Sequence, residues 1–309
     1  QPYRLGVYYF PGWKAEQTGN AYKQPWEKIK PFPEREPLLG WYAEDQPGVM
    51  QQQLQWMSQY GLSYVVFDWM WGLDGQPYLA HGVNTYLAQS NQYGVDFAIL
   101  WANHTNYIFS RAQFVQIFNF WAQRYFFKKE YLKVDGKPLI FIFSAQILAN
   151  NAKKIGLSVA QLVALADSAA KRAGLPGVIF VGGISGNIAA DFDYTASGGF
   201  GAYSAYNFHG PATKSFAPGR HMSHSFSELD EAYRDQWQWM LNNSAGLYIV
   251  PISSGWDKRP WGGSKDPAHD NCRPTDPEFL HHLHAAKNTI DRHPKTRGMG
   301  VICCWNEFG

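Results

Sequence analysis

The chain has 309 residues, of which 45% are hydrophobic, 17% aromatic and 17% charged, and its formal net charge is +2. This small charge argues against a nucleic-acid or membrane-surface partner, and no run approaches the roughly 20 apolar residues of a membrane span. The length fits a single α/β barrel of about 250 residues or more.

Eight apolar runs, rich in β-branched and aromatic residues, recur along the chain. They span residues 5–10, 63–69, 96–102, 138–143, 178–184, 196–203, 247–253 and 300–306. Continuous apolar runs predict strands that are covered on both faces, as in a parallel sheet. The sixth run is the weakest of these signals because it is rich in glycine.

Helical patterns separate these runs, and several carry capping signals. The helices are expected at residues 49–61, 111–126, 158–174, 227–243 and 276–293. Ser158 and Gln161 have the spacing of a capping box at the start of the third helix. Ser227 is expected to be the N-cap of the fourth helix. Asp276 is expected to cap the fifth, with Pro277 at its first position.

The alternation of strand and helix predicts one catalytic (β/α)₈ barrel domain over residues 1–309, because no linker or repeat divides the chain. Residues 11–48 and 204–226 are interpreted as long loops that follow strands. Residues 300–306 should pair beside residues 5–10 and close the barrel. No helical pattern follows the last strand, so we expect the final helix to be absent from this sequence.

Barrels of this kind place their chemistry at the C-terminal ends of the strands, and polar and aromatic side chains gather there in this sequence. Glu307 and Asp68 are the candidate catalytic carboxylates. The candidate substrate-binding residues are Tyr8, Tyr9, Trp13, Trp69, Trp101, Asn103, His104, Trp256, Asp257, Arg259, Trp305 and Asn306. Carboxylates that move protons, rings that stack on sugars and amides that bind hydroxyls together indicate a glycoside site. Since Tyr8 and Tyr9 alternate along a strand, only one should face the barrel interior.

Each candidate also has a purely structural interpretation. Glu307 could be a solvated residue at the end of the sequence, and His104 could be a supporting histidine outside the site. Asp68 could cap a helix or pair with Arg259. Asp257 could serve only as a structural partner of the same arginine.

Motifs of other site classes are absent from the sequence. There is no GxGxxG or GxxxxGK[ST] phosphate loop, no HExxH zinc motif and no serine nucleophile elbow. The histidines do not have metal-ligand spacing, and those on the helix after residue 276 are expected to face solvent. Cys303 and Cys304 should point to opposite sides of a strand, and Cys272 should lie in a loop. We therefore predict no metal, no cofactor and no disulfide framework.

Six motifs follow one another in a fixed order. They are GVYYFPGW (6–13), REPLLGWYAEDQPGVMQQQLQWMSQYGLSYVVFDWMW (35–71), AILWANH (98–104), DGKPLIFIF (135–143), SGWDKRPW (254–261) and CWNEFG (304–309). In this order they resemble the glycoside hydrolase family 99-like proteins, including the WbsX-like family often labelled as glycosyltransferases. The resemblance runs from end to end of the chain and implies a (β/α)₈ barrel.

The resemblance also implies a mechanism. Characterised family 99 enzymes cleave within α-mannans and use the two Glu of a closing N-E-W-x-E-G motif. The first is understood to act as base on the sugar 2-hydroxyl, giving an epoxide-like intermediate, and the second is the acid/base. Glu307 matches the first, whereas the second would fall one residue past Gly309. His104 replaces the Glu of the family's W-A-N-E motif, and Lys258 and Arg259 replace an Asn-Thr pair, which leaves the substrate open.

Three functions remain possible on this basis. The first is a retaining glycoside hydrolase acting on a polysaccharide or other glycan, whose acid is a Glu beyond residue 309, Asp68 or another carboxylate at the barrel mouth. The second is a glycosyltransferase of polysaccharide assembly, and the third is a carbohydrate-binding barrel without activity. We expect an extracellular or periplasmic monomer that has lost a signal peptide and has a carbohydrate as its partner.

Overall fold

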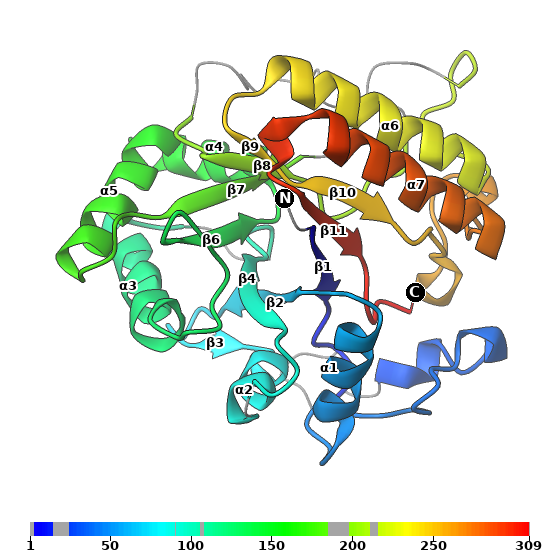
Figure 1. Ribbon diagram of the computed structural model, residues 1–309, viewed down its shortest axis with the longest axis horizontal. Coiled ribbons are helices and arrows are strands. Elements are labelled where there is room, and N and C mark those ends of the chain that lie inside the picture. Colours follow the sequence, from blue (N-terminus) through cyan, green and yellow to red (C-terminus); the bar gives the residue numbers. More distant parts are fainter. Residues whose placement is uncertain are drawn as a thin grey trace.

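In the computed structural model the chain forms a barrel of parallel strands with helices around it (Figure 1). The structure describes residues 3–14, 25–89, 91–105, 108–184, 198–210 and 216–308. The sheet order is β10-β11-β1-β2-β4-β6-β7-β8-β9. Since only Ile249 separates β9 from β10 in the chain, the two ends of this order belong to one continuous segment, and the sheet closes into a barrel. The predicted α/β barrel is confirmed.

The barrel strands agree with the predicted runs, with one exception. They are β1 (Arg4–Tyr9), β2 (Tyr64–Trp71), β4 (Asp96–Trp101), β6 (Lys137–Ile142), β7 (Ile179–Gly183), β8 (Ala202–Ser204), β9 (Leu247–Tyr248), β10 (Val250–Ser253) and β11 (Met299–Cys303). Two short antiparallel strands, β3 (Pro77–Tyr78) and β5 (Lys133–Val134), extend β2 and β6. The predicted strand 196–203 is wrong in its bounds: its first two residues lie outside the described residues, and Gly199 has a φ of +73°, which no strand residue adopts.

The helices lie on the outside of the barrel, where α6 and α7 run side by side (Figure 1). They are α1 (Val49–Gln59), α2 (His81–Ala88), α3 (Arg111–Trp121), which continues as a π-helical turn (Ala122–Phe126), α4 (Ala145–Lys154), α5 (Val159–Arg172), α6 (Phe226–Asn243) and α7 (Asp276–Arg292). Short 3₁₀ turns span Pro25–Lys28, Pro33–Arg35, Arg259–Trp261, Pro267–His269 and Pro294–Thr296. In the described part of the chain, no helix is long and apolar enough to cross a membrane.

Two of the predicted helix caps are wrong, whereas the capping box at the start of α5 is confirmed. α6 is capped by Ser225 rather than Ser227, and α7 by Thr275 rather than Asp276. In α7, Thr275 accepts from the backbone N–H of Glu278, whose side chain reaches back to the backbone of Thr275. This reciprocal pairing satisfies two helix donors at once, which explains why the helix starts one residue earlier than predicted.

The barrel interior is filled by side chains below the level of the site. The ring of Tyr64 passes over Gly6, where a Cβ would lie only 2.2 Å from it, and its hydroxyl donates to the carbonyl of Gly300 at 2.6 Å. Tyr8 points inward above this layer and packs on Phe141 of the opposite wall, with ring centroids 5.9 Å apart. Its neighbour Tyr9 points outward and donates to a side chain of α1. As expected from alternation, only one of the two tyrosines faces the interior.

A second, smaller core lies beneath the loop that follows β1. Trp13 stacks on Trp26 with centroids 4.0 Å apart, and Tyr42 is buried beside them. Phe308, near the end of the sequence, packs against this cluster, and its carbonyl accepts a hydrogen bond from Arg35. The predicted loop 11–48 therefore has a core of its own, which holds the residues after β11 in place.

One histidine of α7 is buried, contrary to the prediction that the histidines of this helix face solvent. His282 is fully buried. Its Nε2 accepts from the backbone N–H of Ser253 at 3.1 Å, so its Nδ1 carries the proton that is donated to Asp230 at 2.7 Å. This bridge ties two helices to the end of β10, where the loop that bears Trp256 begins.

We predict that His282→Ala destabilises the protein by about 2–4 kcal/mol, because it leaves the buried N–H of Ser253 without its partner and removes one of the two strong hydrogen bonds to the Asp230 carboxylate, the other coming from Arg234. The change is measured as the free energy of unfolding in urea. The control is His284→Ala on the exposed side of the same helix, for which we expect a change within about 0.5 kcal/mol. Equal effects of the two substitutions would contradict the structural role of His282.

Candidate functional site

A cavity of about 380 Å³ opens at the C-terminal ends of the strands, within the size range of ligand sites. It lies between the residues that follow β8, β10 and β11 and the loop that follows β1. Its lining residues are Glu34, Arg35, Glu36, Asn207, Ser254, Gly255, Trp256, Asp257, Arg273, Pro274, Cys303, Cys304, Trp305, Glu307 and Phe308. Residues far apart in sequence thus converge where barrels of this class place their chemistry.

The two candidate carboxylates, Glu307 and Asp68, contact the same side chain, that of Tyr206. Its hydroxyl oxygen lies 2.8 Å from Oε2 of Glu307 and 3.1 Å from Oδ2 of Asp68. The two carboxyl groups are therefore much closer than two barrel-strand spacings, about 10 Å. Glu307 lines the cavity, whereas Asp68 is buried behind Tyr206 and does not line it.

These three groups have to share their protons. The Tyr206 hydroxyl has one proton and can donate it to only one carboxyl group, so the other contact is favourable only if that carboxyl is protonated and donates. Burial, and next the charge of Glu307, raise the pKa of Asp68 well above its usual value, against the Tyr206 hydrogen bond. Its Oδ1 has no partner among the described residues, which costs less for a neutral carboxyl than for an ion. Tyr206 therefore links the two carboxyl groups, and both contacts are hydrogen bonds when one of the two groups is protonated.

Glu307 is the member of this chain of hydrogen bonds that reaches the cavity. Its side chain is open to the cavity, but the surrounding protein removes much of its hydration. This desolvation raises its pKa to about 7, while the hydrogen bond from Tyr206 acts in the opposite direction. A carboxyl group with a pKa near neutrality can both accept and return a proton at physiological pH.

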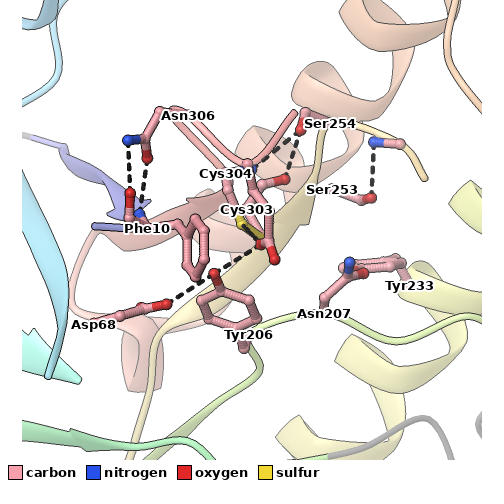
Figure 2. Close-up of a disulfide and its surroundings, with 12 residues drawn as sticks. Phe10, Asp68, Tyr206, Asn207, Tyr233, Ser253, Ser254, Cys303, Cys304 and Asn306 are labelled. Atoms are coloured by element: carbon pink, nitrogen blue, oxygen red, sulfur yellow. Dashed lines mark hydrogen bonds between the residues drawn. A yellow bond between two sulfur atoms is a disulfide. The ribbon is translucent and has the colours of Figure 1, made fainter. Parts of the chain in front are cut away.

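A disulfide between the adjacent residues Cys303 and Cys304 forms the cavity wall beside Glu307 (Figure 2). The sequence analysis predicted none, and this prediction is wrong. β11 ends at Cys303, so the alternation of a strand no longer governs the direction of Cys304. The two sulfur atoms and an oxygen of Glu307 lie within 4.8 Å of one another, a spacing that would suit a metal ion, but sulfur atoms bonded to each other cannot act as thiolate ligands.

Trp256 and Asp257 follow β10 and both line the cavity. Arg259 donates to Asp257 through Nε at 2.8 Å and Nη2 at 2.6 Å, and Arg35 and Arg273 each lie 3.9 Å from the same carboxylate. Burial would raise the pKa of Asp257, but the hydrogen bonds from Arg259 and the nearby cations outweigh it, and the pKa is lowered. Asp257 is thus held ionised, and Arg259 binds it from outside the cavity lining.

Two tryptophans expected in the site, Trp69 and Trp101, face the helices. Nε1 of Trp69 donates to the hydroxyl of Tyr125 at 3.2 Å, and Trp101 packs against Trp121 at the end of α3. Both are buried in the layer between barrel and helices. Trp305, by contrast, lines the cavity as expected.

Three further candidate substrate-binding residues form hydrogen bonds with backbone groups. The amide of Asn306 receives from the N–H of Phe10 and donates to its carbonyl, both at 2.8 Å. The amide of Asn103 makes the same pair of bonds with the backbone of Ser144, at 3.0 and 2.9 Å. Nε1 of Trp13 donates to the carbonyl of Asn306 at 2.5 Å. Each asparagine thus fastens the end of its own strand to the end of the next one, and neither lines the cavity.

His104 is exposed outside the cavity, and its ring lies on that of Phe143 with centroids 4.1 Å apart. Phe143 in turn contacts the ring of Tyr206 at 5.4 Å. Desolvation lowers the pKa of His104. The rings of Phe143 and Tyr206 thus lie between His104 and the carboxylates.

The sequence analysis missed Tyr206, which joins the two carboxylates. With the sixth strand placed at 196–203, this residue belonged to a loop without a known partner. Tyr206 lies two residues past the end of β8, so the rule used for the other strands would have selected it had it been applied to this glycine-rich run. Arg35 and Glu34 were also missed, since a loop gives no periodic signal that shows which of its residues return to the site.

Comparison with known proteins agrees with the barrel fold. The sequence profile of a family described as "Glycosyltransferase WbsX" matches residues 29–309. A solved structure described as "Glycoside hydrolase-like protein" superposes with a TM-score of 0.66 at 13% identity, over 99% of this chain and 85% of that one. Two structures of the GH99 endo-alpha-mannosidase from Bacteroides thetaiotaomicron give TM-scores of 0.63 and 0.61 at 13% and 16% identity, over 99% of this chain and 84% and 85% of theirs. No functionally curated protein matches the sequence.

Identities this low establish the shared barrel but not a shared activity. The family profile, by contrast, covers nearly the whole chain, including all the residues that line the cavity. The protein therefore belongs to the WbsX family, and its fold is that of the glycoside hydrolase family 99-like barrels.

Proposed function

We propose that the protein is a retaining glycoside hydrolase that cleaves a glycosidic bond in a polysaccharide or other glycan. The observation that carries this proposal is the position of Glu307. It lines a cavity of suitable size, its pKa is raised to about 7, and a hydrogen-bonded tyrosine and a second carboxyl lie behind it. A carboxyl group prepared in this way is what proton transfer at a sugar hydroxyl or glycosidic oxygen requires.

In this proposal the side chains have different roles. Glu307 accepts a proton from the substrate. Asp68 does not line the cavity, so it acts as a positioning residue that orients Tyr206, and Tyr206 in turn orients Glu307. Trp256 and Trp305 line the cavity and offer ring faces for the apolar faces of sugars.

The acid that protonates the leaving group is not assigned to a single residue. Besides Glu307, the carboxylates that line the cavity are Glu34, Glu36 and Asp257. Asp257 is held ionised by arginines, and Glu34 pairs with Arg259 at 2.9 Å. Neither is suited to carry a proton, which leaves Glu36 of these three, or the glutamate that the family motif has one residue past Gly309.

A glycosyltransferase is the second candidate, and the name of the matching family favours it. The sequence also contains one Asp-x-Asp triplet, Asp191-Phe192-Asp193, a spacing suited to binding a metal-bound diphosphate. This triplet lies outside the described residues. A transferase would need a nucleotide sugar as donor, so the two candidates differ in the substrate that they require.

The deciding experiment incubates the protein with a panel of polysaccharides that includes α-mannans, with and without nucleotide sugars. The hydrolase proposal expects new reducing ends without a nucleotide sugar, and the first anomer detected by NMR should retain the configuration of the substrate. Release of nucleotide that depends on an acceptor glycan would support the transferase. Binding without turnover under all conditions would refute both.

We predict that Glu307→Gln lowers kcat by at least ~10²-fold, because a positioned general base contributes about that much. Glycan binding should persist, since the substitution is nearly isosteric. The comparison uses steady-state kinetics and calorimetric binding, with Glu27→Gln on the exposed loop surface as the control, for which kcat should stay within about two-fold. Wild-type turnover in the Glu307 variant would remove Glu307 from the mechanism.

We predict that Tyr206→Phe moves the ionisation of Glu307 to higher pH, because the hydrogen bond from Tyr206 favours the charged form. The midpoint near pH 7 in the profile of kcat/KM should shift upward. Tyr131→Phe is the matched control: it removes a buried hydroxyl that donates to Leu139 at 2.7 Å, away from the cavity, and should leave the midpoint unchanged. An unchanged midpoint in Tyr206→Phe would contradict the hydrogen-bond chain.

A third prediction concerns stability and does not depend on the substrate. The folded-state pKa of Glu307, about 7, is raised above the usual 4.5, so the folded protein binds this proton more tightly than the unfolded chain. The resulting stabilisation is complete below pH 4.5 and is lost as the pH rises through about 7. Allowing for screening of this exposed side chain, wild type should lose about 1 kcal/mol more than Glu307→Gln between pH 5 and 8.5. Urea unfolding measures this; parallel pH profiles would show that the pKa of Glu307 is not raised.

A further inference from the structure

The disulfide between Cys303 and Cys304 lies against the carboxylate on which the proposed function depends. Sγ of Cys304 is 3.3 Å from Oε2 of Glu307, the same oxygen that accepts from Tyr206. Figure 2 shows Asp68 and Tyr206 on one side of the disulfide and Ser254 on the other. Cys304 is half-buried and lines the cavity, so both substrate and small reductants can reach this wall.

The backbone around the disulfide is held firmly. Oγ of Ser254 donates to the carbonyl of Cys303 at 2.7 Å and accepts from the N–H of Cys304 at 3.1 Å. The N–H of Ser254 also donates to the carbonyl of Cys303, at 2.8 Å. These hydrogen bonds, together with the ring that joins the two side chains, hold the sulfur beside Glu307.

The chemistry of that sulfur depends on its oxidation state. A disulfide sulfur has no proton and cannot donate a hydrogen bond, whereas a thiol is a weak donor. In the oxidised protein, Oε2 of Glu307 therefore accepts from Tyr206, and the bonded sulfur adds apolar surface beside it. After reduction, the Cys304 thiol would be placed to donate to the same oxygen, and both cysteine side chains would be free to rotate.

We propose that the Cys303–Cys304 disulfide is a positioning element for Glu307: oxidised, it keeps the carboxylate available as a proton acceptor, and reduced, it supplies a competing donor and slows the reaction. This inference rests on the proposed function of Glu307. The reduction itself is an ordinary exchange in which a dithiol gives two electrons and two protons. The S–S bond breaks, two thiols form and the dithiol becomes a disulfide.

Reduction should affect Glu307 in a defined direction. A donor to the charged form favours that form and makes the carboxylate a weaker base. We therefore expect the pH midpoint of Glu307 to fall in the reduced protein and kcat to fall by about ten-fold, while KM changes little because the cavity wall keeps its backbone. A merely structural disulfide would change stability without moving this midpoint.

Three variants separate the effect of losing the disulfide from the effect of gaining a hydrogen-bond donor beside Glu307. Cys304→Ser lacks the disulfide and places a hydroxyl donor beside Glu307, so it should behave like the reduced wild type. The double substitution Cys303→Ala/Cys304→Ala lacks both the disulfide and the donor, so its midpoint should stay near that of the oxidised protein and should not respond to reductant. Cys272→Ala, which removes the buried free cysteine, controls for reductant effects elsewhere, and it should respond to reductant as wild type does.

The experiment compares wild type and these variants before and after dithiothreitol, and after reoxidation, which should restore the oxidised behaviour. Intact-protein mass spectrometry follows the redox state. The midpoint of Glu307 is measured from the ¹³C carboxyl signal of labelled glutamate, assigned with Glu307→Gln, and from the pH profile of kcat wherever a substrate is turned over. The proposal is overturned if protein purified in air has three free thiols, or if the carboxyl titrates identically in the oxidised and reduced forms.

The carboxyl titration keeps this inference distinct from the proposed function. A midpoint that falls on reduction supports the positioning role even if no glycan in the panel is hydrolysed, in which case only the hydrolase proposal fails. Hydrolysis by Glu307 with the same midpoint and the same kcat in both redox states supports the hydrolase and removes the disulfide from its mechanism.

Discussion

The candidate site depends on the pairing of β11 with two strands at once. Val301 pairs with Gly6 of β1 and with Pro251 of β10, so this strand closes the barrel and its direction is set on both sides. The residues that follow it must then emerge at the C-terminal mouth. There Asn306 holds the backbone of Phe10 by two hydrogen bonds. Glu307 is thus positioned by barrel closure rather than by any helix.

The cavity contains two carboxyl groups whose environments push their pKa values in opposite directions. Around Glu307 the protein removes part of the hydration, one neutral group donates a hydrogen bond and no cation bonds the carboxylate among the described residues, so its pKa is raised. Around Asp257 three arginines converge, and its pKa is lowered. Separate pKa values of this kind distinguish a group that exchanges protons from one that organises its surroundings. The arginines also connect the loop after β1 to the loop after β10, so the lowered pKa accompanies a structural role.

The predicted site residues that do not line the cavity were misassigned for one physical reason. In a parallel barrel both faces of each strand are buried, so the sequence does not mark which of two neighbouring aromatic residues faces inward. Trp69 lies within β2 and Trp101 is the last residue of β4, but both pack against Trp121 at the end of α3. Asn103 and Asn306 also lie at strand ends as predicted, and their amides bind backbone. A strand-end position therefore selects residues near the site, while the direction of the side chain decides whether a residue reaches it.

The sequence by itself determined the barrel, the order of its strands, most of its helices and the family, because these depend on local hydrophobic periodicity and on motifs in a fixed order. It also placed Asp68 on one, and Glu307 just past the other, of the two strands that flank β1. Only the tertiary structure showed that Tyr206 joins them, that Cys303 and Cys304 form the wall beside Glu307, and that His282 is buried. Each of these depends on contacts between segments distant in the chain or on where a strand ends, and neither leaves a periodic signal in the sequence.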